Sequence, residues 1–348
     1  MPDSPLSLRA FSRLLGLSRT TVSEALRGSP RVKSATARRI LEAAREAGYR
    51  HNPLAGALMS EMRRSRSGTF RGVIALLDPD GPAGRPPGSA RFHGELARGA
   101  SLRAGELGFK TELFSPGLGR NRLSLRRLGE VFLARGIRGL FILPVREEPD
   151  LSALDWSRFS GLYADHVIAR PALHTLCSDH HRALFLALDR LHALGYRRPG
   201  LVLHRSHDAR LLHRWEAAGR IWPAYYGGTR RKPSPLILDR PEQAAFTRWF
   251  RATRPDVVLG HDPVLLRWMT AAGAHVPQTH GFCCLNLTNS EQPCAGLDLQ
   301  PATLGARGIE LLAGQLLRND CGIPATASAT LLPARWVDGP TVRAPQSD

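Results

Sequence analysis

The stretch "GLSRTTVSEALRG" (residues 16–28) joins a glycine to a short segment that holds few apolar residues. Ser18 is a favourable N-cap, because its side-chain oxygen can accept a backbone N–H of the first helical turn. Val22 and Leu26 follow at a spacing of four and share the inner face of the predicted helix. Polar and basic residues fall on another face: Arg19, Ser23 and Arg27, with Thr20 beside them. The stretch therefore predicts a short helix with an apolar inner side and a polar, basic outer side.

Two further helices are predicted around this one. The first has an apolar stripe that consists of Leu8, Phe11 and Leu15. The third follows a Ser34 cap, runs over residues 36–47, and has its apolar positions at Ile40, Leu41 and Ala44. Three such helices with a glycine in the turn between the first two are typical of a helix-turn-helix domain. A small helical bundle with a solvated charged face is the alternative that the spacing leaves open.

The charge of the chain favours a polyanionic partner, either nucleic acid or an anionic membrane surface. The formal net charge is +18 and the sequence pI is about 11.1. Residues 1–68 hold 13 Lys and Arg against 5 Asp and Glu, whereas the rest of the chain holds 35 against 25. The basic character is therefore concentrated in the helical segment, whose short hydrogen-bonding groups suit a DNA groove.

Several other classes of protein find little support in the sequence. No apolar run is long enough to span a membrane and the first residues lack a signal-peptide pattern, so we expect a cytoplasmic protein without membrane contact. The motifs of common hydrolases, P-loop enzymes and zinc peptidases are absent, so we expect no enzyme, catalytic residue, cofactor or metal. The cysteines show no C-x-x-C pair and are expected to be reduced: Cys177, Cys283, Cys284, Cys294 and Cys321.

The rest of the chain alternates between predicted strands and helices, which favours a parallel sheet covered on both faces. The strand candidates are residues 71–77, 109–114, 138–143, 199–204, 234–238 and 256–260. A polar, basic run ends at Gly68, just before the first of these strands, and marks a domain boundary. A Pro- and Gly-rich loop at residues 78–90 is either the rim of a binding site or a linker.

The N-terminal segment resembles the lac repressor/galactose repressor family of bacterial transcription regulators. Residues 16–28 are similar to that family's turn and recognition helix, and residues 32–58 are similar to its third helix, Tyr-x-x-Asn-Pro motif and hinge helix. The resemblance implies a DNA-binding set: Ser18, Arg19, Thr20, Thr21, Ser23, Arg27, Asn52 and Leu58. Within it, Arg19 and Thr20 would contact base edges, and Leu58 would wedge into the minor groove.

This resemblance also implies a domain order. Residues 1–52 would form an all-α helix-turn-helix domain, residues 53–68 a hinge helix and linker, and residues 69–348 an α/β effector-binding and dimerisation domain. The last part would have two lobes joined by three crossovers, like periplasmic sugar-binding proteins. Two departures stand out, because Gly56 weakens the hinge helix and Glu24 brings a carboxylate close to DNA phosphates.

Candidate effector-binding residues follow from the general position of ligands, outside the carboxyl ends of parallel strands. Asp179 and Asp262 begin predicted helices at that edge and match family aspartates, although both could simply be N-caps. Arg210 or Arg214 would supply the family's ligand-facing arginine. The remaining candidates are the two rings of Phe92 and His93, which would either stack on a ligand or fill the core.

We therefore expect a ligand-responsive regulator, in particular a homodimeric repressor that binds a pseudo-palindromic double-stranded operator and a small-molecule effector such as a sugar or related metabolite. A solute-binding protein and a sugar-modifying enzyme are the two alternatives. The basic N-terminal segment argues against the first and the missing catalytic motifs against the second.

Overall fold

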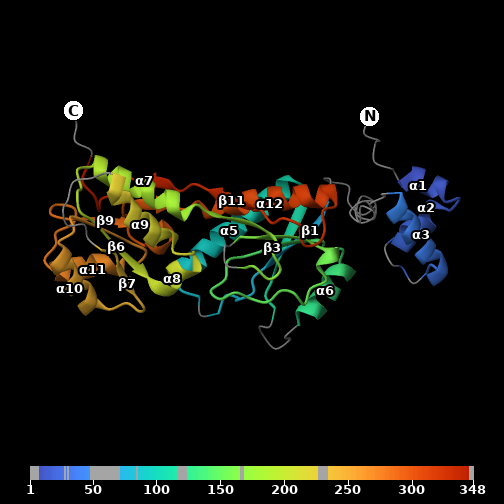
Figure 1. The fold of residues 1–348 in the computed structure, drawn as a ribbon, viewed down its shortest axis with the longest axis horizontal. Coiled ribbons are helices and arrows are strands. Elements are labelled where there is room, and N and C mark those ends of the chain that lie inside the picture. The colour runs from blue at the N-terminus through green and yellow to red at the C-terminus, as the bar shows by residue number, and fades with distance from the viewer. Residues whose placement is uncertain are drawn as a thin grey trace.

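The structure is a computed structural model that describes residues 8–26, 29, 31–47, 71–83, 85–116, 124–164, 168–225 and 234–344. These residues form a small helical domain and two α/β lobes (Figure 1). The predicted fold class is therefore correct. The predicted hinge and linker at residues 53–68 lie outside the described residues. Within the described ranges, no helix combines the length and the apolar character needed to cross a membrane.

The helical domain consists of α1 (Leu8–Leu14), α2 (Arg19–Leu26) and α3 (Ser34–Glu46). Its core is small and apolar: Phe11, Val22, Ala25, Ile40 and Ala44 are all buried. Ser18 caps α2 as predicted, because its Oγ accepts the Thr21 N–H at 3.1 Å. Two details were wrong. Ser34 is already inside α3, which begins one residue after Lys33, and Leu41 is 43% exposed because the buried stripe runs through Ile40 and Ala44.

The first lobe is built on a parallel sheet in the order β11-β5-β4-β3-β1-β2. Its strands are β1 (Gly72–Leu77), β2 (Phe109–Phe114), β3 (Gly139–Ile142), β4 (Ser160–Tyr163), β5 (His174–Ser178) and β11 (Ala329–Leu332). Helices α5 (Pro87–Glu106) and α12 (Pro301–Arg318) pack on one face through one apolar cluster. Helix α6 (Leu125–Ala134) and the short turn η1 (Trp156–Arg158) pack on the other.

The second lobe repeats this plan with the strand order β12-β10-β9-β8-β6-β7. Its strands are β6 (Pro199–His204), β7 (Leu236–Leu238), β8 (Val257–Gly260), β9 (Gly281–Cys284), β10 (Gly296–Asp298) and β12 (Arg335–Val337). Only the edge pairing of β10 with β12 is antiparallel among the described pairs. Helices α7 (His180–Ala193) and α9 (Arg214–Tyr225) cover one face, and α10 (Gln243–Thr253) and α11 (Val264–Ala271) cover the other.

The chain passes between the two sheets three times, as the family resemblance implied. It leaves the first lobe after β5, returns from β10 into α12, and leaves again from β11 to β12. Each lobe is therefore discontinuous in sequence. The six predicted strands all exist, but six more short strands were missed.

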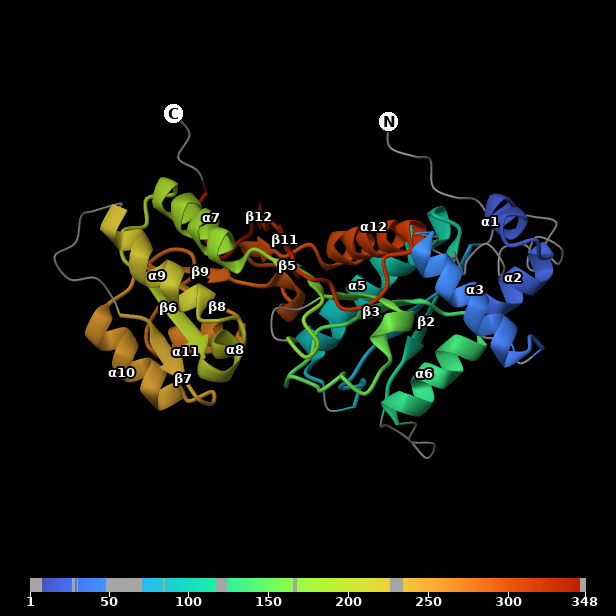
Figure 2. The same ribbon diagram turned by 45° about the vertical axis from the view of Figure 1, so that its right-hand side comes forward.

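Helices α5 and α12 approach each other so closely that glycine is required at the contact (Figure 2). A Cβ on Gly99 would lie 2.0 Å from the carbonyl oxygen of Ala302, and a Cβ on Gly305 would lie 2.0 Å from that of Leu96. An ion pair between Arg103 and Glu310 at 2.8 Å joins the same two helices. This contact fixes α12, the first element of the chain after its return from the second lobe.

We predict that Gly305→Ala lowers the free energy of unfolding by about 1 to 3 kcal/mol, because the new methyl group must push two backbones apart. Gly94→Ala is the matched control on α5, since no described atom lies within 4 Å of a Cβ built there. This control should stabilise the chain by up to about 1 kcal/mol through helix propensity. Urea denaturation measures the free energy of unfolding of both variants. An equal change in this free energy for the two substitutions would contradict the close contact between the helices.

Candidate functional site

The first candidate surface is the polar side of α2. Thr20 is exposed in the first turn of the helix, beside Ser18 and Thr21, whose hydroxyl oxygens are 2.8 Å apart. Ser18 and Thr21 therefore hold each other in place, whereas Thr20 faces solvent. Glu24 lies 3.9 Å from Arg31 across an exposed ion pair, which offsets part of its negative charge.

The remaining members of the predicted DNA-binding set are only partly covered by the structure. Ser23 lies on α2 and is half-buried. The side chain of Arg19 lies outside the description, as do Arg27, Asn52 and Leu58 entirely. Their assignment to DNA stays a prediction.

The second candidate site lies where the two lobes meet. Helix α8 (Arg205–Arg210) belongs to the second lobe and directly follows β6. Arg210 at its end donates from Nη1 to the carbonyl oxygen of Val145, just after β3 of the first lobe. In the opposite direction, Arg91 of α5 donates from Nε to the Thr288 carbonyl oxygen at 2.7 Å. Because both acceptors follow carboxyl ends of parallel strands, this interlobe seam coincides with the expected ligand edge.

Phe92 and His93 both lie in this seam. Phe92 is half-buried and packs against the main apolar clusters of both lobes. His93 is buried, with Nδ1 2.9 Å from the Ser89 carbonyl oxygen and Nε2 2.7 Å from that of Pro144. The Phe92 ring therefore fills part of the seam, whereas His93 ties α5 to the segment after β3 within the first lobe.

Asp179 and Asp262 both act as helix caps. Asp179 accepts the Arg182 N–H at 3.1 Å at the start of α7, and Asp262 accepts the Val264 N–H at 2.9 Å before α11. Each bond uses Oδ1, and a carboxylate has acceptor capacity beyond one bond. Capping thus does not conflict with a bond from each carboxylate to a ligand hydroxyl.

A group of aromatic and histidine side chains, of which His207 is half-buried and the others are buried, lies next to Asp262 at the end of β8. The His261 ring is 4.6 Å from the His207 ring and 5.1 Å from the Trp215 ring, measured between centroids. Neither ring nitrogen of His261 has a hydrogen-bond partner among the described residues. Burial lowers the pKa of His261 well below its ordinary value and lowers that of His207 to about 4, with the charge of Arg210 acting in the same direction. Both imidazoles are therefore neutral near pH 7.

The loop after β1 is held by a buried ion pair and is not a linker. Arg85 and Asp78 form two parallel bonds of 2.8 and 3.1 Å, and both side chains are almost fully buried. Asp80 accepts the backbone N–H of Arg146 at 2.6 Å, which joins this loop to the one after β3. The loop is also shorter than predicted, because α5 already begins at Pro87. It forms a fixed rim on the first-lobe side of the seam.

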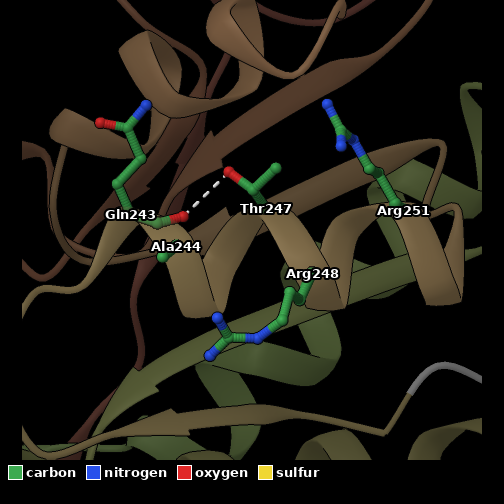
Figure 3. Close-up of a pocket in the computed structure, with 5 residues that line it drawn as sticks. All are labelled: Gln243, Ala244, Thr247, Arg248 and Arg251. Carbon is green, nitrogen blue, oxygen red and sulfur yellow. Dashed lines mark hydrogen bonds between the residues drawn. The ribbon is translucent and has the colours of Figure 1, made fainter.

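A shallow pocket lies elsewhere, on the outer surface of α10 (Figure 3). It is lined by Gln243, Ala244, Thr247, Arg248 and Arg251. The Thr247 hydroxyl is used within the helix, since it donates to the Gln243 carbonyl oxygen at 2.9 Å. All these residues belong to one exposed helix face, so we do not assign the pocket to the seam.

Some seam residues could not be found from the sequence. Trp215 follows the predicted Arg214 directly and His207 lies three residues before the predicted Arg210, but only the fold brings them to His261. The ion pair between Asp78 and Arg85 was also missed, because the loop that contains both residues was interpreted only from its Pro and Gly content. An acidic and a basic residue seven positions apart at a strand end were the available signal.

The described residues thus combine a three-helix N-terminal domain with two α/β lobes that are joined by three crossovers. Residues 11–52 match the family described as bacterial regulatory proteins, lacI family. The predicted resemblance to the lac and galactose repressors is thereby confirmed.

One curated protein is similar to part of this chain, and solved structures share the fold of nearly all of it. The HTH-type transcriptional regulator AglR of Rhizobium meliloti (strain 1021) is 54% identical over 76 residues, which cover 22% of this chain and 21% of the relative. The structure of the transcriptional regulator CelR in complex with cellobiose has a TM-score of 0.57 at 19% identity, covering 96% of this chain and 99% of the other. The lac repressor dimer bound to operator and the anti-inducer ONPF has a TM-score of 0.56 at 16% identity, covering 98% and 100%. These proteins are regulators and not enzymes.

The buried histidines predict an acid-sensitive fold. In the unfolded chain His207 takes up a proton near pH 6.5, whereas in the folded chain it stays neutral until about pH 4. The unfolded state therefore binds more protons in this window, and stability falls as the pH decreases through it. Relative to His207→Gln, the natural chain should lose up to roughly 3 kcal/mol of unfolding free energy between pH 7 and pH 4. Denaturation curves over this pH range measure the difference, and parallel pH profiles would exclude it.

Proposed function

We propose that this chain is a cytoplasmic, ligand-responsive repressor that binds a pseudo-palindromic DNA operator as a homodimer. A small-molecule effector, a sugar or related metabolite, binds in the interlobe seam and changes the affinity for DNA. The observation that carries this proposal is the joining of a lacI-family helix-turn-helix domain to two lobes whose strand ends meet. The solute-binding and sugar-modifying alternatives do not account for the DNA-binding domain.

The proposed DNA contact is the outer side of α2. Thr20 is exposed there, the small hydroxyl groups of Ser18 and Thr21 lie beside it, and Arg19 begins the helix. Arginine suits guanine edges, and hydroxyl groups suit phosphates or bases. Asn52 and Leu58 are proposed to contact DNA from the segment after α3, as the family resemblance implies.

The homodimer is supported by exposed apolar side chains in both lobes. In the first lobe, Leu102 on α5 is 60% exposed and Leu113 on β2 is 57% exposed. In the second lobe, Ile221 and Tyr225 on α9 are 48% and 76% exposed. A two-fold dimer would cover such patches and present two α2 helices to the two halves of a palindromic site.

The proposed effector site draws on polar groups at helix starts and turns of the second lobe and on one ring of the first. Asp179 and Asp262 offer carboxylate oxygens, Arg210 and Arg214 bracket the turn between α8 and α9, and Phe92 offers a ring. Aspartates, an arginine and an aromatic face together suit a ligand rich in hydroxyl groups. The complex of CelR with cellobiose shows that a protein of this fold binds such a ligand.

Arg19→Ala tests the DNA contact. We expect it to weaken operator binding by about 1 to 3 kcal/mol and to relax the preference at one base pair per half-site, because a bidentate contact to one base would be lost. Selection from random duplexes followed by anisotropy titrations measures both effects. The control is Arg39→Ala on the exposed side of α3, which should weaken all duplexes equally if it matters at all. An equal loss on all sequences for Arg19→Ala would instead show a phosphate contact.

The effector site is tested at Asp179 and Asp262, with sugars first screened for thermal stabilisation of the natural chain. Asp179→Ala or Asp262→Ala should abolish the response to the stabilising sugar and leave operator binding in its absence nearly intact. Each change also removes a cap worth about 1 kcal/mol. Asn at either position keeps the cap and separates this loss from loss of the ligand contact. An unchanged response in both Ala variants would remove the aspartates from the site.

A further inference from the structure

Three metal-ligating side chains converge at the turn between α8 and α9, and no part of the proposed function uses them. They are Asp208 on α8, His213 in the turn and Glu216 in the first turn of α9. His213 Nδ1 lies 3.9 Å from Asp208 Oδ2 and 3.7 Å from Glu216 Oε2, and all three ligand atoms lie within 4.8 Å of one another. One imidazole nitrogen and two carboxylate oxygens thus lie close together.

The backbone forces this convergence. Leu212 and His213 both adopt left-handed conformations with φ 56°, which costs roughly 1 to 2 kcal/mol for each non-glycine residue. Leu211, just before these two residues, is buried in the apolar core of the second lobe and holds the turn against it. The reversal places His213 over the Asp208 carboxylate, although five positions separate them in the sequence.

Each carboxylate is oriented by other groups. Asp208 is almost fully buried and accepts the backbone N–H groups of Trp215 and Glu216 at 3.1 and 3.2 Å. Glu216 uses Oε1 to accept from Nε and Nη2 of Arg220, at 2.8 and 2.6 Å. Its other oxygen, Oε2, is the one turned toward His213. Outer partners that fix ligands in this way are typical of metal sites.

We propose that Asp208, His213 and Glu216 bind a divalent transition-metal ion of the zinc type. Zn²⁺ takes nitrogen and oxygen ligands at about 2.0 to 2.2 Å, whereas Mg²⁺ and Ca²⁺ prefer oxygen alone. Tetrahedral ligands at that range are about 3.3 Å apart, so His213 Nδ1 has to move about half an ångström closer to each carboxylate oxygen. The two carboxylate oxygens, which lie within 4.8 Å of each other, also have to approach. The exposed His213 ring allows the first movement, and the partly exposed Glu216 side chain allows the second. Water would complete the coordination.

The position of this metal site links it to the seam. The same turn carries Arg210, which contacts Val145 of the first lobe, and leads into Trp215, which contacts His261. A bound ion would hold α8 and α9 together at their junction. It would therefore stiffen the second-lobe side of the seam, a role that is separate from reading DNA.

The site is tested with the full chain, freed of metal with a chelator and titrated with Zn²⁺ by calorimetry. We expect one ion per chain, and His213→Ala and Glu216→Gln should each raise the Kd at least roughly tenfold. His275→Ala is the matched control, because His275 is also an exposed histidine of the second lobe and should leave the Kd unchanged. Circular dichroism checks that each variant is folded.

Binding of Co²⁺ identifies the ligands independently. The proposed set gives weak visible bands without thiolate charge transfer, whereas a site on the cysteines would show that transfer. Absence of binding, thiolate bands, or an unchanged Kd in His213→Ala would overturn the proposal. In that case His213 only lies beside its two carboxylate neighbours. Operator binding is measured separately with the metal-free chain. A failure of the metal-site proposal therefore leaves the proposed function untouched.

Discussion

The backbone contact between α5 and α12 is the constraint on which the two-lobed structure depends. Gly99 and Gly305 let each helix place a carbonyl oxygen where a Cβ would otherwise be. Helix α12 comes directly after the return from β10, and β11 follows it into the first sheet beside β5. The same α5 carries Arg91, Phe92 and His93 to the seam. One glycine-mediated contact therefore fixes both the return of the chain and the first-lobe side of the proposed effector site.

The connection between the lobes differs in kind from the interior of each lobe. Each sheet has apolar clusters on both faces, whereas the seam is held by polar bonds, such as Arg210 to Val145 and Arg91 to Thr288, together with the ring of Phe92. Individual polar bonds contribute only about 0.5 to 1.5 kcal/mol. A ligand that offers its own hydroxyl groups to these side chains can therefore replace them and favour a different lobe arrangement.

The sequence was most informative where a local rule decides the structure. Ser18 capped α2 as predicted, and the predicted strands other than β2 carry continuous apolar runs such as residues 72–77. The missed strands are short or lie at edges, like β10 and β12, and their pairing depends on neighbours that are distant in sequence. Leu41 shows the limit of apolar spacing, because adjacent residues on a helix point about 100° apart and only Ile40 meets the core.

The candidate sites show the same division. Asp179 and Asp262 could be predicted because strand ends and helix starts have local signatures in the sequence. In the structure each of them accepts a backbone N–H at a helix start, as the capping alternative expected. The contact of His261 with His207 and Trp215 required the tertiary structure. The turn that aims His213 at Asp208 depends on two left-handed residues, neither of which is a glycine, so no sequence rule predicted it.

The most direct test of the account is sequence-specific DNA binding by the full chain. Anisotropy titrations at physiological salt would compare a two-fold symmetric duplex obtained by selection with a scrambled duplex of the same length and composition. We expect the symmetric duplex to bind at least roughly a thousandfold more tightly, with two chains per duplex. Both duplexes attract the basic chain through their phosphates, but only the symmetric one adds the base contacts. Equal affinity for the two duplexes would show that the basic segment provides only charge, and would contradict the assignment of a regulator.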